Sequence, residues 1–453
     1  MNSHRQTKRA LLTSVMALVM CVVMLLGTTF AWFTDTATAN VNTIKSGNLH
    51  VEIQNKEGTA IDKLEWVKEN GDVIANQDDI LWEPGCTYLL TPFKIVNTGN
   101  LALKYKIEIT GLDGSAKLLK VIKFTYKTED GNTFDMTAEG KLAANGGATG
   151  MITVSAHMDE LAGNEYQNET LTGVKFTVVA TQDTVEHDSS KNTYDENATY
   201  PVVAKNQAEV NNAITNTTEK NVTIAVPAGQ TTTLDNDIAN ESNNNGKSRN
   251  VTFIGDGSQT VDIVTKAVNA AEGNEMNYQR GSSFAFQNVT VQGGTTTYGG
   301  IVCNELTFEN CTIKDKLTLY GKATFINCTF ENDMADQYSI WTWGGTDVTF
   351  EGCTFNTNGK AILLYGGATA SNPTNLVVNN CTFNDRNNGT AGKAAIEIGN
   401  DYNATYTLTV NNATVNGFAI NANGTNTGSK LWANKNSMDA AHLTVIIDGV
   451  KVQ

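Results

Sequence analysis

Four cysteines recur in nearly identical surroundings, and thiols repeated in this way could bind zinc, form disulfides or fill a core. They lie in the stretches FENCTI, FINCTF, FEGCTF and VNNCTF, as Cys311, Cys328, Cys353 and Cys381. Zinc needs close cysteine pairs or a nearby histidine, whereas 17 to 28 residues without histidine separate these positions. A disulfide needs side chains that converge rather than stand parallel. We therefore expect reduced thiols that serve as small buried hydrophobes.

The position before each cysteine accepts fewer residue types than the cysteine position itself. Seven copies of the motif align, and this position holds only asparagine or glycine: Asn288, Asn310, Asn327, Gly352, Asn380, Asn412 and Gly449. These two residue types best tolerate a left-handed backbone conformation. Each copy therefore predicts a strand, a tight bend and a second strand.

The spacing of the copies is typical of coils in a parallel β-helix. From Val289 through the four cysteines and Ala413 to Val450, the successive intervals are 22, 17, 25, 28, 32 and 37 residues. One coil of a right-handed β-helix fits these intervals if the longer coils carry loop insertions. The same alignment predicts that Val289, the cysteines, Ala413 and Val450 form one ladder that faces the interior.

A second family of strands lies between these bends, in LTLYG, IWTWG, ILLYG and IEIG. If the first residue of each strand faces inward, the two-residue period turns a set of aromatic side chains outward: Tyr320, Trp341, Trp343 and Tyr365. Flat aromatic rings suit sugar rings, so these four residues are a candidate glycan-binding surface. The alternative is that loops of the longer coils cover them.

Residues 204–453 resemble right-handed parallel β-helices of the pectin-lyase type, many of which cleave acidic polysaccharides with carboxylates and a basic residue. The nearest cluster of this kind comprises Asp385, Arg386, Glu397 and Asp401. Scattered surface charge explains it better, and we assign no catalytic residue, metal or cofactor. An envelope-associated polysaccharide lyase or hydrolase remains the alternative function.

The amino terminus predicts export. Basic residues precede an apolar run over 10–27, as in a signal peptide, although a retained membrane-spanning segment is the alternative. The small residues of TTFAW favour cleavage just after the run, with Ala37 to Ala39 as a second option. A net charge of -15 argues against a nucleic-acid partner and suits a secreted protein.

The two parts of the mature chain differ in pattern. Residues 43–188 alternate apolar and polar residues in short runs separated by turn signals, which predicts an antiparallel β-sandwich. Residues 189–203 are polar and contain Pro201, which indicates a linker. A helical pattern over 206–215 then precedes the first strand of the β-helix, where it would cover the open end. The expected fold is all-β: a sandwich over 32–188, then a β-helix over 204–453 with a short capping helix.

Three stretches carry a further resemblance, to the TasA/camelysin family of Gram-positive surface proteins. They are TTFAWFTDTATANVNTIKSGNLHVEI, WEPGCTYLLTPFKIVNTGNLALKYKIEI and HMDELAGNEYQNETLTGVKFTVVATQDT, within residues 1 to about 195. The resemblance implies a jelly-roll sandwich and cleavage by a SipW-type signal peptidase between Ala31 and Trp32, which leaves 1–31 as the signal peptide. It also implies fibres in which residues 32–46 enter a neighbouring subunit as a donor strand.

Camelysin carries a metallopeptidase label, but this sequence has no HExxH motif. The nearest constellation is His157, Asp159 and Glu160, for which we expect a turn or surface role. The sequence therefore predicts a protein secreted to the matrix or cell surface of a Gram-positive bacterium, with self-assembly and extracellular polysaccharide as the expected interactions. A plain structural spacer that binds no ligand is a third alternative.

Overall fold

The computed structural model describes residues 49–453 except 62–63, 73, 75–79, 81, 111–116, 167–168, 170–174, 184–199, 236, 241–247, 264–275, 295–298, 336, 366–370, 400–403 and 421–427. The predicted signal peptide, the Ala31–Trp32 cleavage point and the donor segment 32–46 therefore lie outside the described residues. No helix among the described residues is long and apolar enough to cross a membrane.

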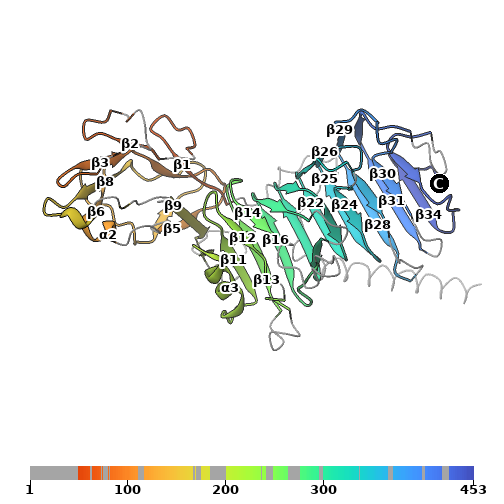
Figure 1. The fold of residues 1–453 in the computed structure, drawn as a ribbon, viewed down its shortest axis with the longest axis horizontal. Coiled ribbons are helices and arrows are strands. Elements are labelled where there is room, and N and C mark those ends of the chain that lie inside the picture. Colours follow the sequence, from red (N-terminus) through yellow and green to blue (C-terminus); the bar gives the residue numbers. More distant parts are fainter. Residues whose placement is uncertain are drawn as a thin grey trace, which may run out of the picture.

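The amino-terminal part is built from antiparallel strands, as its two-residue periodicity predicts (Figure 1). Strand β8 shows the cause, because inward residues alternate with half-buried ones along its whole length. The first sheet pairs β1 (Val51–Gln54) with β4 (Lys94–Asn97). The second contains, in order, β2 (Trp66–Val67), β3 (Thr87–Leu90), β8 (Ile152–Met158) and β6 (Ile122–Thr128). The third contains β7 (Gly140–Leu142), β5 (Leu103–Thr110) and β9 (Lys175–Gln182). Short helices α2 (Leu118–Val121) and η2 (Asn164–Tyr166) lie between strands.

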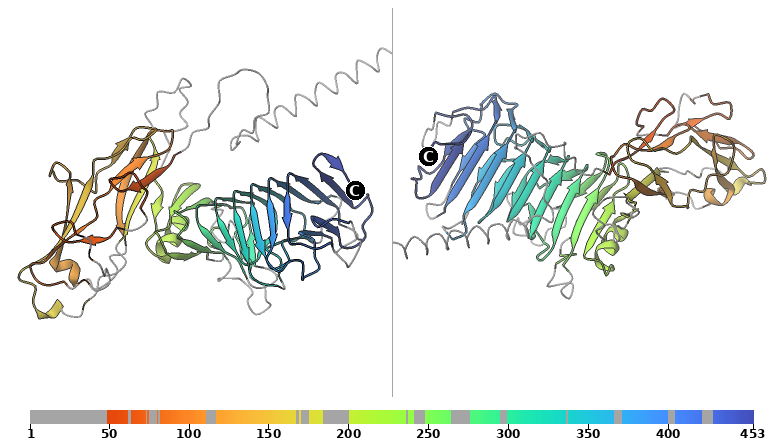
Figure 2. Two further views of the ribbon diagram at one scale, coloured as in Figure 1. Left: turned by 90° about the horizontal axis from the view of Figure 1, so that it is seen from above. Right: turned by 180° about the vertical axis from the view of Figure 1, so that it is seen from behind.

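Three sheets, parallel except for one terminal strand, form the carboxy-terminal part, whose coils stack along the long axis (Figure 2). The first sheet contains β10 (Val202–Val203), β11 (Asn221–Ala225), β13 (Asn250–Ile254), β16 (Ser283–Gln287), β19 (Glu305–Glu309), β22 (Lys322–Ile326), β25 (Asp347–Glu351), β28 (Thr374–Asn379), β31 (Tyr406–Asn411), β34 (Leu443–Ile447) and β35 (Val450–Lys451). The second contains β12 (Thr231–Thr233), β14 (Thr260–Asp262), β17 (Thr290–Gln292), β20 (Thr312–Lys314), β23 (Thr329–Asn332), β26 (Thr354–Thr357), β29 (Thr382–Asp385) and β32 (Thr414–Asn416). The third contains β15 (Met276–Tyr278), β18 (Gly300–Val302), β21 (Leu317–Leu319), β24 (Ile340–Thr342), β27 (Ile362–Leu364), β30 (Ile396–Ile398) and β33 (Trp432–Asn434). This all-β architecture confirms the predicted fold class.

Helix α3 (Gln207–Thr215) covers the amino-terminal end of the β-helix, as predicted. Asn206 begins the helix by accepting a hydrogen bond from the Glu209 backbone N–H at 3.1 Å. Val210 and Ile214 are buried in the core of the first coils. The Gln207 amide donates to the Thr233 carbonyl at 2.6 Å and accepts from the Thr233 N–H at 2.7 Å, so it satisfies part of the free edge of β12.

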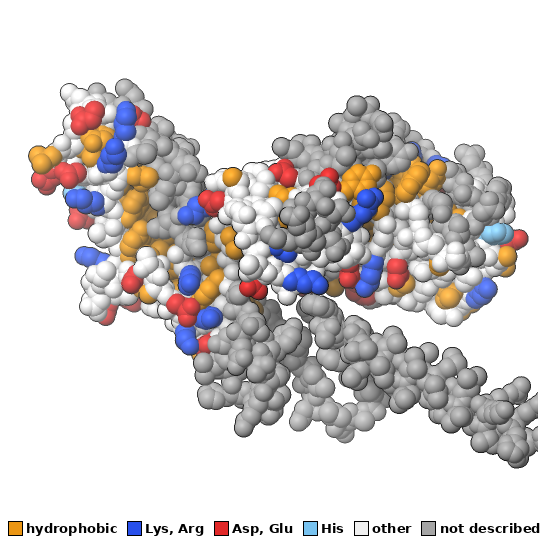
Figure 3. Space-filling model, turned by 90° about the horizontal axis from the view of Figure 1, so that it is seen from below, with side chains coloured by type: hydrophobic (Ala, Val, Ile, Leu, Met, Phe, Trp, Pro, Cys, Tyr) orange, Lys and Arg blue, Asp and Glu red, His pale blue; other side chains and the backbone are white. Residues whose placement is uncertain are grey.

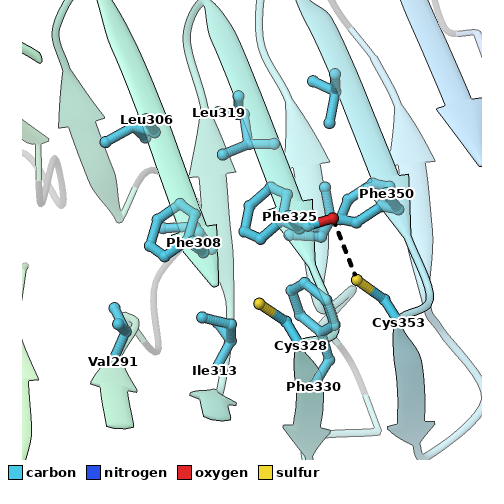
Figure 4. Close-up of a cluster of buried hydrophobic side chains, with 14 of the residues drawn as sticks. Val291, Leu306, Phe308, Ile313, Leu319, Phe325, Cys328, Phe330, Phe350 and Cys353 are labelled. Carbon is cyan, nitrogen blue, oxygen red and sulfur yellow. Dashed lines mark hydrogen bonds between the residues drawn. The ribbon is translucent and has the colours of Figure 1, made fainter. Parts of the chain in front are cut away.

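Stacked rings and thiols fill the interior of the coils (Figure 4). One stack runs through the first sheet, with ring centroids of Phe308 and Phe325 4.5 Å apart and nearly parallel. In the second sheet, Phe330 and Phe355 stack at 4.2 Å. The coil spacing places identical residues above one another, and each ring therefore excludes water from its neighbours.

The last copy of the repeated motif is not a corner of a coil. Asp448 and Gly449 both have positive φ (48° and 78°), and β34 and β35 pair as an antiparallel hairpin in which Ile447 faces Val450. Two consecutive residues of this kind favour a tight hairpin turn. Val450 is 62% exposed, so the prediction that it continues the buried ladder was wrong.

Candidate functional site

The third sheet places the candidate aromatic residues on its outer side. Leu317, Ile340 and Ile362 occupy one register position on β21, β24 and β27, and all three are fully buried. Because side chains alternate along a strand, residues at an odd distance from these positions face outward. Tyr320, Trp343 and Tyr365 each lie three residues after these buried positions and form one outward row. Trp341 lies one residue after Ile340 and faces the same side.

The ring geometry of this row brings three of the four predicted residues into contact. The rings of Trp343 and Tyr365 are stacked, with centroids 5.2 Å apart and an interplanar angle of 23°. Trp341 meets Tyr365 edge-on at 5.1 Å. Trp343 is 38% exposed, whereas Tyr320, Trp341 and Tyr365 are partly buried. Figure 3 shows hydrophobic side chains gathered on one side of the β-helix, with Lys or Arg side chains beside them.

Backbone contacts fix the positions of these rings. The Thr342 hydroxyl accepts a hydrogen bond from the Tyr365 N–H at 2.9 Å and donates to the Tyr365 carbonyl at 3.2 Å, which ties β24 to the next coil. The ring of Tyr320 lies close to Gly300, because a Cβ there would be 3.2 Å from Tyr320 Cε2. The row therefore lies on strands that are hydrogen-bonded from one coil to the next.

A buried polar layer lies beside the aromatic row, and sequence reasoning missed most of it. Lys316, just before β21, is fully buried, and its Nζ lies 3.9 Å from the centroid of the Trp341 ring. The same Nζ donates to Gln337 Oε1 at 3.0 Å. Burial, with a smaller contribution from the Lys360 ammonium, lowers the pKa of Lys316 to about 7.

Glu397 belongs to this layer, and the prediction that it is part of a scattered surface charge was wrong. Its side chain is fully buried on β30, accepts a hydrogen bond from the Tyr338 hydroxyl and pairs with Lys393 Nζ at 3.1 Å. Burial and the Glu397 carboxylate raise the pKa of Tyr338. The alternating pattern of IEIG could have indicated that Glu397 belongs to the polar layer, because it places Glu397 on the outer side of β30, between two inward isoleucines.

The other members of the predicted acidic cluster do not join Glu397. Asp385 is 6% exposed and holds the following loop by accepting from the N–H groups of Asn387 and Gly389 at 2.8 and 2.7 Å. Arg386 pairs with Glu331 and Asp333 on the surface. Asp401 lies outside the described residues. The described members of the cluster therefore do not form a catalytic group.

The repeated motif forms the corners of the coils at six of its seven positions. Asn288, Asn310, Asn327, Asn380 and Asn412 have φ between 52° and 54°, and Gly352 has φ 64°. Behind each corner the inward side chain is at most 2% exposed for Val289 and the four cysteines, whereas Ala413 is partly buried.

The six described cysteines are free thiols. Within the ladder, the Cys353 thiol donates to the Phe325 carbonyl at 3.5 Å (Figure 4), and Cys353 N–H approaches Cys381 Sγ at 3.4 Å. A hydrogen bond with Cys328 and burial both raise the pKa of Cys311, and the same causes raise that of Cys353. Hydrogen bonds from neighbouring thiols instead lower the pKa of Cys328 and of Cys381. All four cysteines of the ladder are shielded from solvent.

Residues 157–160, which contain His157, Asp159 and Glu160, make local contacts at the end of β8. His157 Nδ1 lies 2.8 Å from the Thr87 hydroxyl on the neighbouring strand β3. Asp159 directly follows β8 and begins the next turn, next to Glu160, where its side chain accepts from the Leu161 N–H at 2.9 Å. Among the described residues, no group of three histidine, cysteine or acidic side chains could hold a metal ion.

Comparison with known proteins supports the fold of the carboxy-terminal part. Residues 276–442 match the family model described as right handed beta helix region. No curated protein sequence matches the chain. The solved Agl-KA catalytic domain aligns with 91% of this chain and 100% of its own at 12% identity and a TM-score of 0.22. The catalytic domain of a GH87 α-1,3-glucanase in complex with tetrasaccharides aligns with 88% of this chain and 98% of its own at 12% identity and a TM-score of 0.17. Overall similarity of this size carries no functional argument, and the family match is what establishes residues 276–442 as a right-handed β-helix region.

Proposed function

We propose that the β-helix binds extracellular glycans along the outward row formed by Tyr320, Trp341, Trp343 and Tyr365. The observation that carries this proposal is the stacked pair of Trp343 and Tyr365, in which Trp343 is 38% exposed. An exposed aromatic face of this kind offers a flat apolar surface for a sugar ring, and it loses little conformational entropy on binding. The neighbouring Trp341 meets the pair edge-on and supports its orientation.

The wider proposal is a secreted surface or matrix protein of a Gram-positive bacterium. In this proposal the sandwich serves assembly or anchoring, and the β-helix serves as a long display surface. The sequence resemblance of residues 1 to about 195 to the TasA/camelysin family supports it, together with the predicted signal peptide. A SipW-type signal peptidase would release the mature chain at Trp32, and residues 32–46 would act as the donor strand.

A glycan array tests the binding part of the proposal. The chain from Trp32 onward and its Trp343→Ala variant are compared, with Leu161→Ala as the matched control because Leu161 is 92% exposed on the sandwich. We expect binding that Trp343→Ala weakens at least tenfold and Leu161→Ala leaves unchanged. Equal binding by both variants, or none by the unaltered chain, would contradict a glycan surface at this row.

An activity screen on pectins and other uronates separates binding from catalysis. No observation on the described residues favours the enzyme alternative, because the Glu397 carboxylate is fully buried and already paired with Lys393 and Tyr338. Turnover of any substrate would favour the enzyme. Assembly is tested separately by electron microscopy of chains beginning at Trp32 and at Gly47, and fibres formed equally by both would exclude the donor segment.

A further inference from the structure

The outer face of strand β9 is buried, although this strand lies at the edge of its sheet. Val179 is 3% exposed and Thr181 is 6% exposed. Phe176, Val178 and Ala180 pack against the core of the sandwich and are only partly buried. Because side chains alternate along a strand, Val179 and Thr181 point away from that core. A part of the chain outside the sandwich therefore covers them.

The cover is the beginning of the β-helix, whose first coils lie directly beside the sandwich (Figure 1). Val179 forms one buried cluster with Val203 of β10 and Ala225 of β11. Tyr200, just before β10, and Ile254 of β13 pack against this cluster. We call these five residues the joint, because they are apolar or aromatic side chains that connect the two parts of the chain.

The β-helix side of the joint is an outward row of its first sheet. Val203, Ala225 and Ile254 share one register position on three neighbouring strands. In the next four coils the same position holds Gln287, Glu309, Ile326 and Glu351. The row is thus entirely apolar over the strands beside the sandwich and mainly polar beyond them. Apolar surface is favourable where another surface removes it from water, so this change in the row matches the position of the sandwich.

Tyr200 also contacts strand β5, the neighbour of β9 in the sandwich. Its ring centroid lies 4.4 Å from Lys106 Nζ and 5.4 Å from Lys104 Nζ. The pairing of β5 with β9 places Lys106 opposite Val179, so both side chains share the outer face of this sheet. Burial and the nearby Glu139 carboxylate raise the pKa of Tyr200. An ammonium group is attracted to an aromatic face, and Tyr200 is therefore held from two adjacent strands.

We propose that the joint keeps the sandwich docked on the first coils in solution, so that the two parts of the chain move as one body. Contacts between domains often permit relative motion, but an apolar interface opposes it. Each side of the joint carries apolar surface that the other side removes from water. Both sides also belong to one chain, so docking is intramolecular and remains closed even with a small interface.

Docking through the joint has consequences for both parts of the chain. The sandwich joins α3 in covering the amino-terminal end of the β-helix, with α3 at the second sheet and the sandwich at the first. The outer face of β5 and β9 is occupied and is therefore closed to other proteins, so contacts between chains must use other surfaces of the sandwich. The β-helix also keeps one direction relative to its own sandwich. These consequences hold whether or not the aromatic row binds glycans.

Small-angle X-ray scattering tests the joint on the mature chain, with size-exclusion chromatography to select the monomer. We expect the unaltered chain to scatter as one rigid particle. Ile254→Lys places a charge in the joint and should increase the radius of gyration and the maximum dimension. Ile326→Lys is the matched control, because it changes the same residue type in the same row, three coils beyond the joint. It should leave both dimensions unchanged.

Two substitutions at Tyr200 provide a second test of the joint. Tyr200→Ala removes the ring and should increase both dimensions, whereas Tyr200→Phe keeps the ring beneath the two ammonium groups and should retain the compact particle. Circular dichroism verifies that each variant is folded, and the comparison of Ile254→Lys with Ile326→Lys decides if Tyr200→Ala does not fold. Scattering of the unaltered chain as two independently moving bodies would overturn the proposal. Equal dimensions for the Ile254 and Ile326 variants would overturn it as well.

Discussion

Lys316 and Trp341 form a buried cation–π pair across two coils, with the lysine Nζ 3.9 Å from the ring centroid and the lysine side chain fully shielded from solvent. Two opposing effects act on this lysine. The aromatic face favours the ammonium form, whereas burial and the Lys360 charge disfavour it. The second effect dominates, because the pKa of Lys316 is lowered to about 7.

This shift predicts a stability that rises with pH. The pKa of Lys316 is about 7 in the folded chain and 10.5 for an ordinary lysine, so between these values the unfolded chain binds more protons. The free energy of unfolding should therefore increase from pH 7 toward pH 10. Below pH 7 Lys316 is protonated in both the folded and the unfolded chain, so it adds no pH dependence there. Lys316→Met should flatten this dependence in denaturant titrations.

The control for the pH dependence is Lys322→Met, which removes an exposed lysine from the first sheet. Its unfolding free energy should keep the same slope against pH as the unaltered chain. Equal slopes in all three proteins would show that Lys316 titrates normally.

The corner residues predict a difference between alanine and glycine. Asn327 has φ 52°, where alanine is strained and glycine is not. Asn327→Ala should lower the free energy of unfolding by about 1–2 kcal/mol, whereas Asn327→Gly should change it little. Chemical denaturation measures both values. A loss as large in the glycine variant would mean that the Asn side chain, rather than its backbone conformation, is required.

The thiol ladder predicts protection from alkylation. Cys311, Cys328, Cys353 and Cys381 are at most 2% exposed, and burial contributes to the raised pKa of Cys311 and Cys353. Iodoacetamide should leave these four unmodified in the native chain and label all of them after denaturation without reductant. Peptide mass mapping reads the result. A pair that requires reductant for labelling would reveal a disulfide.

The repeat was predictable from sequence because each corner imposes the same local backbone requirement. Asn327 and its counterparts report a positive φ that few residues adopt, so the motif reveals the coil wherever it recurs. Gly449 satisfies the same rule in a hairpin, since the motif does not specify whether the next strand starts a new coil or pairs back. The local pattern therefore identifies a bend but leaves its topology undetermined.

The polar layer could not be predicted because its contacts are distant in sequence. Tyr338 contacts Glu397 across 59 residues of sequence, so this contact depends on how the coils stack. The outward direction of Trp343 and Tyr365 follows from alternation alone, whereas their stacking requires the register between β24 and β27. Lys316 resembled any surface lysine before a short strand.

The cap at the amino-terminal end of the β-helix gives the last prediction. Gln207 pairs with both the N–H and the carbonyl of Thr233 at 2.7 and 2.6 Å, in place of a neighbouring strand. Gln207→Ala leaves these backbone groups without that partner, and it should cost about 1–3 kcal/mol where the edge is shielded from water. An exposed edge also promotes association between chains. We expect a lower midpoint of unfolding and more aggregation by light scattering. Asn212→Ala, on the exposed side of α3, should show neither, and a Gln207 variant as stable and monodisperse as this control would mean that the cap does not depend on the glutamine.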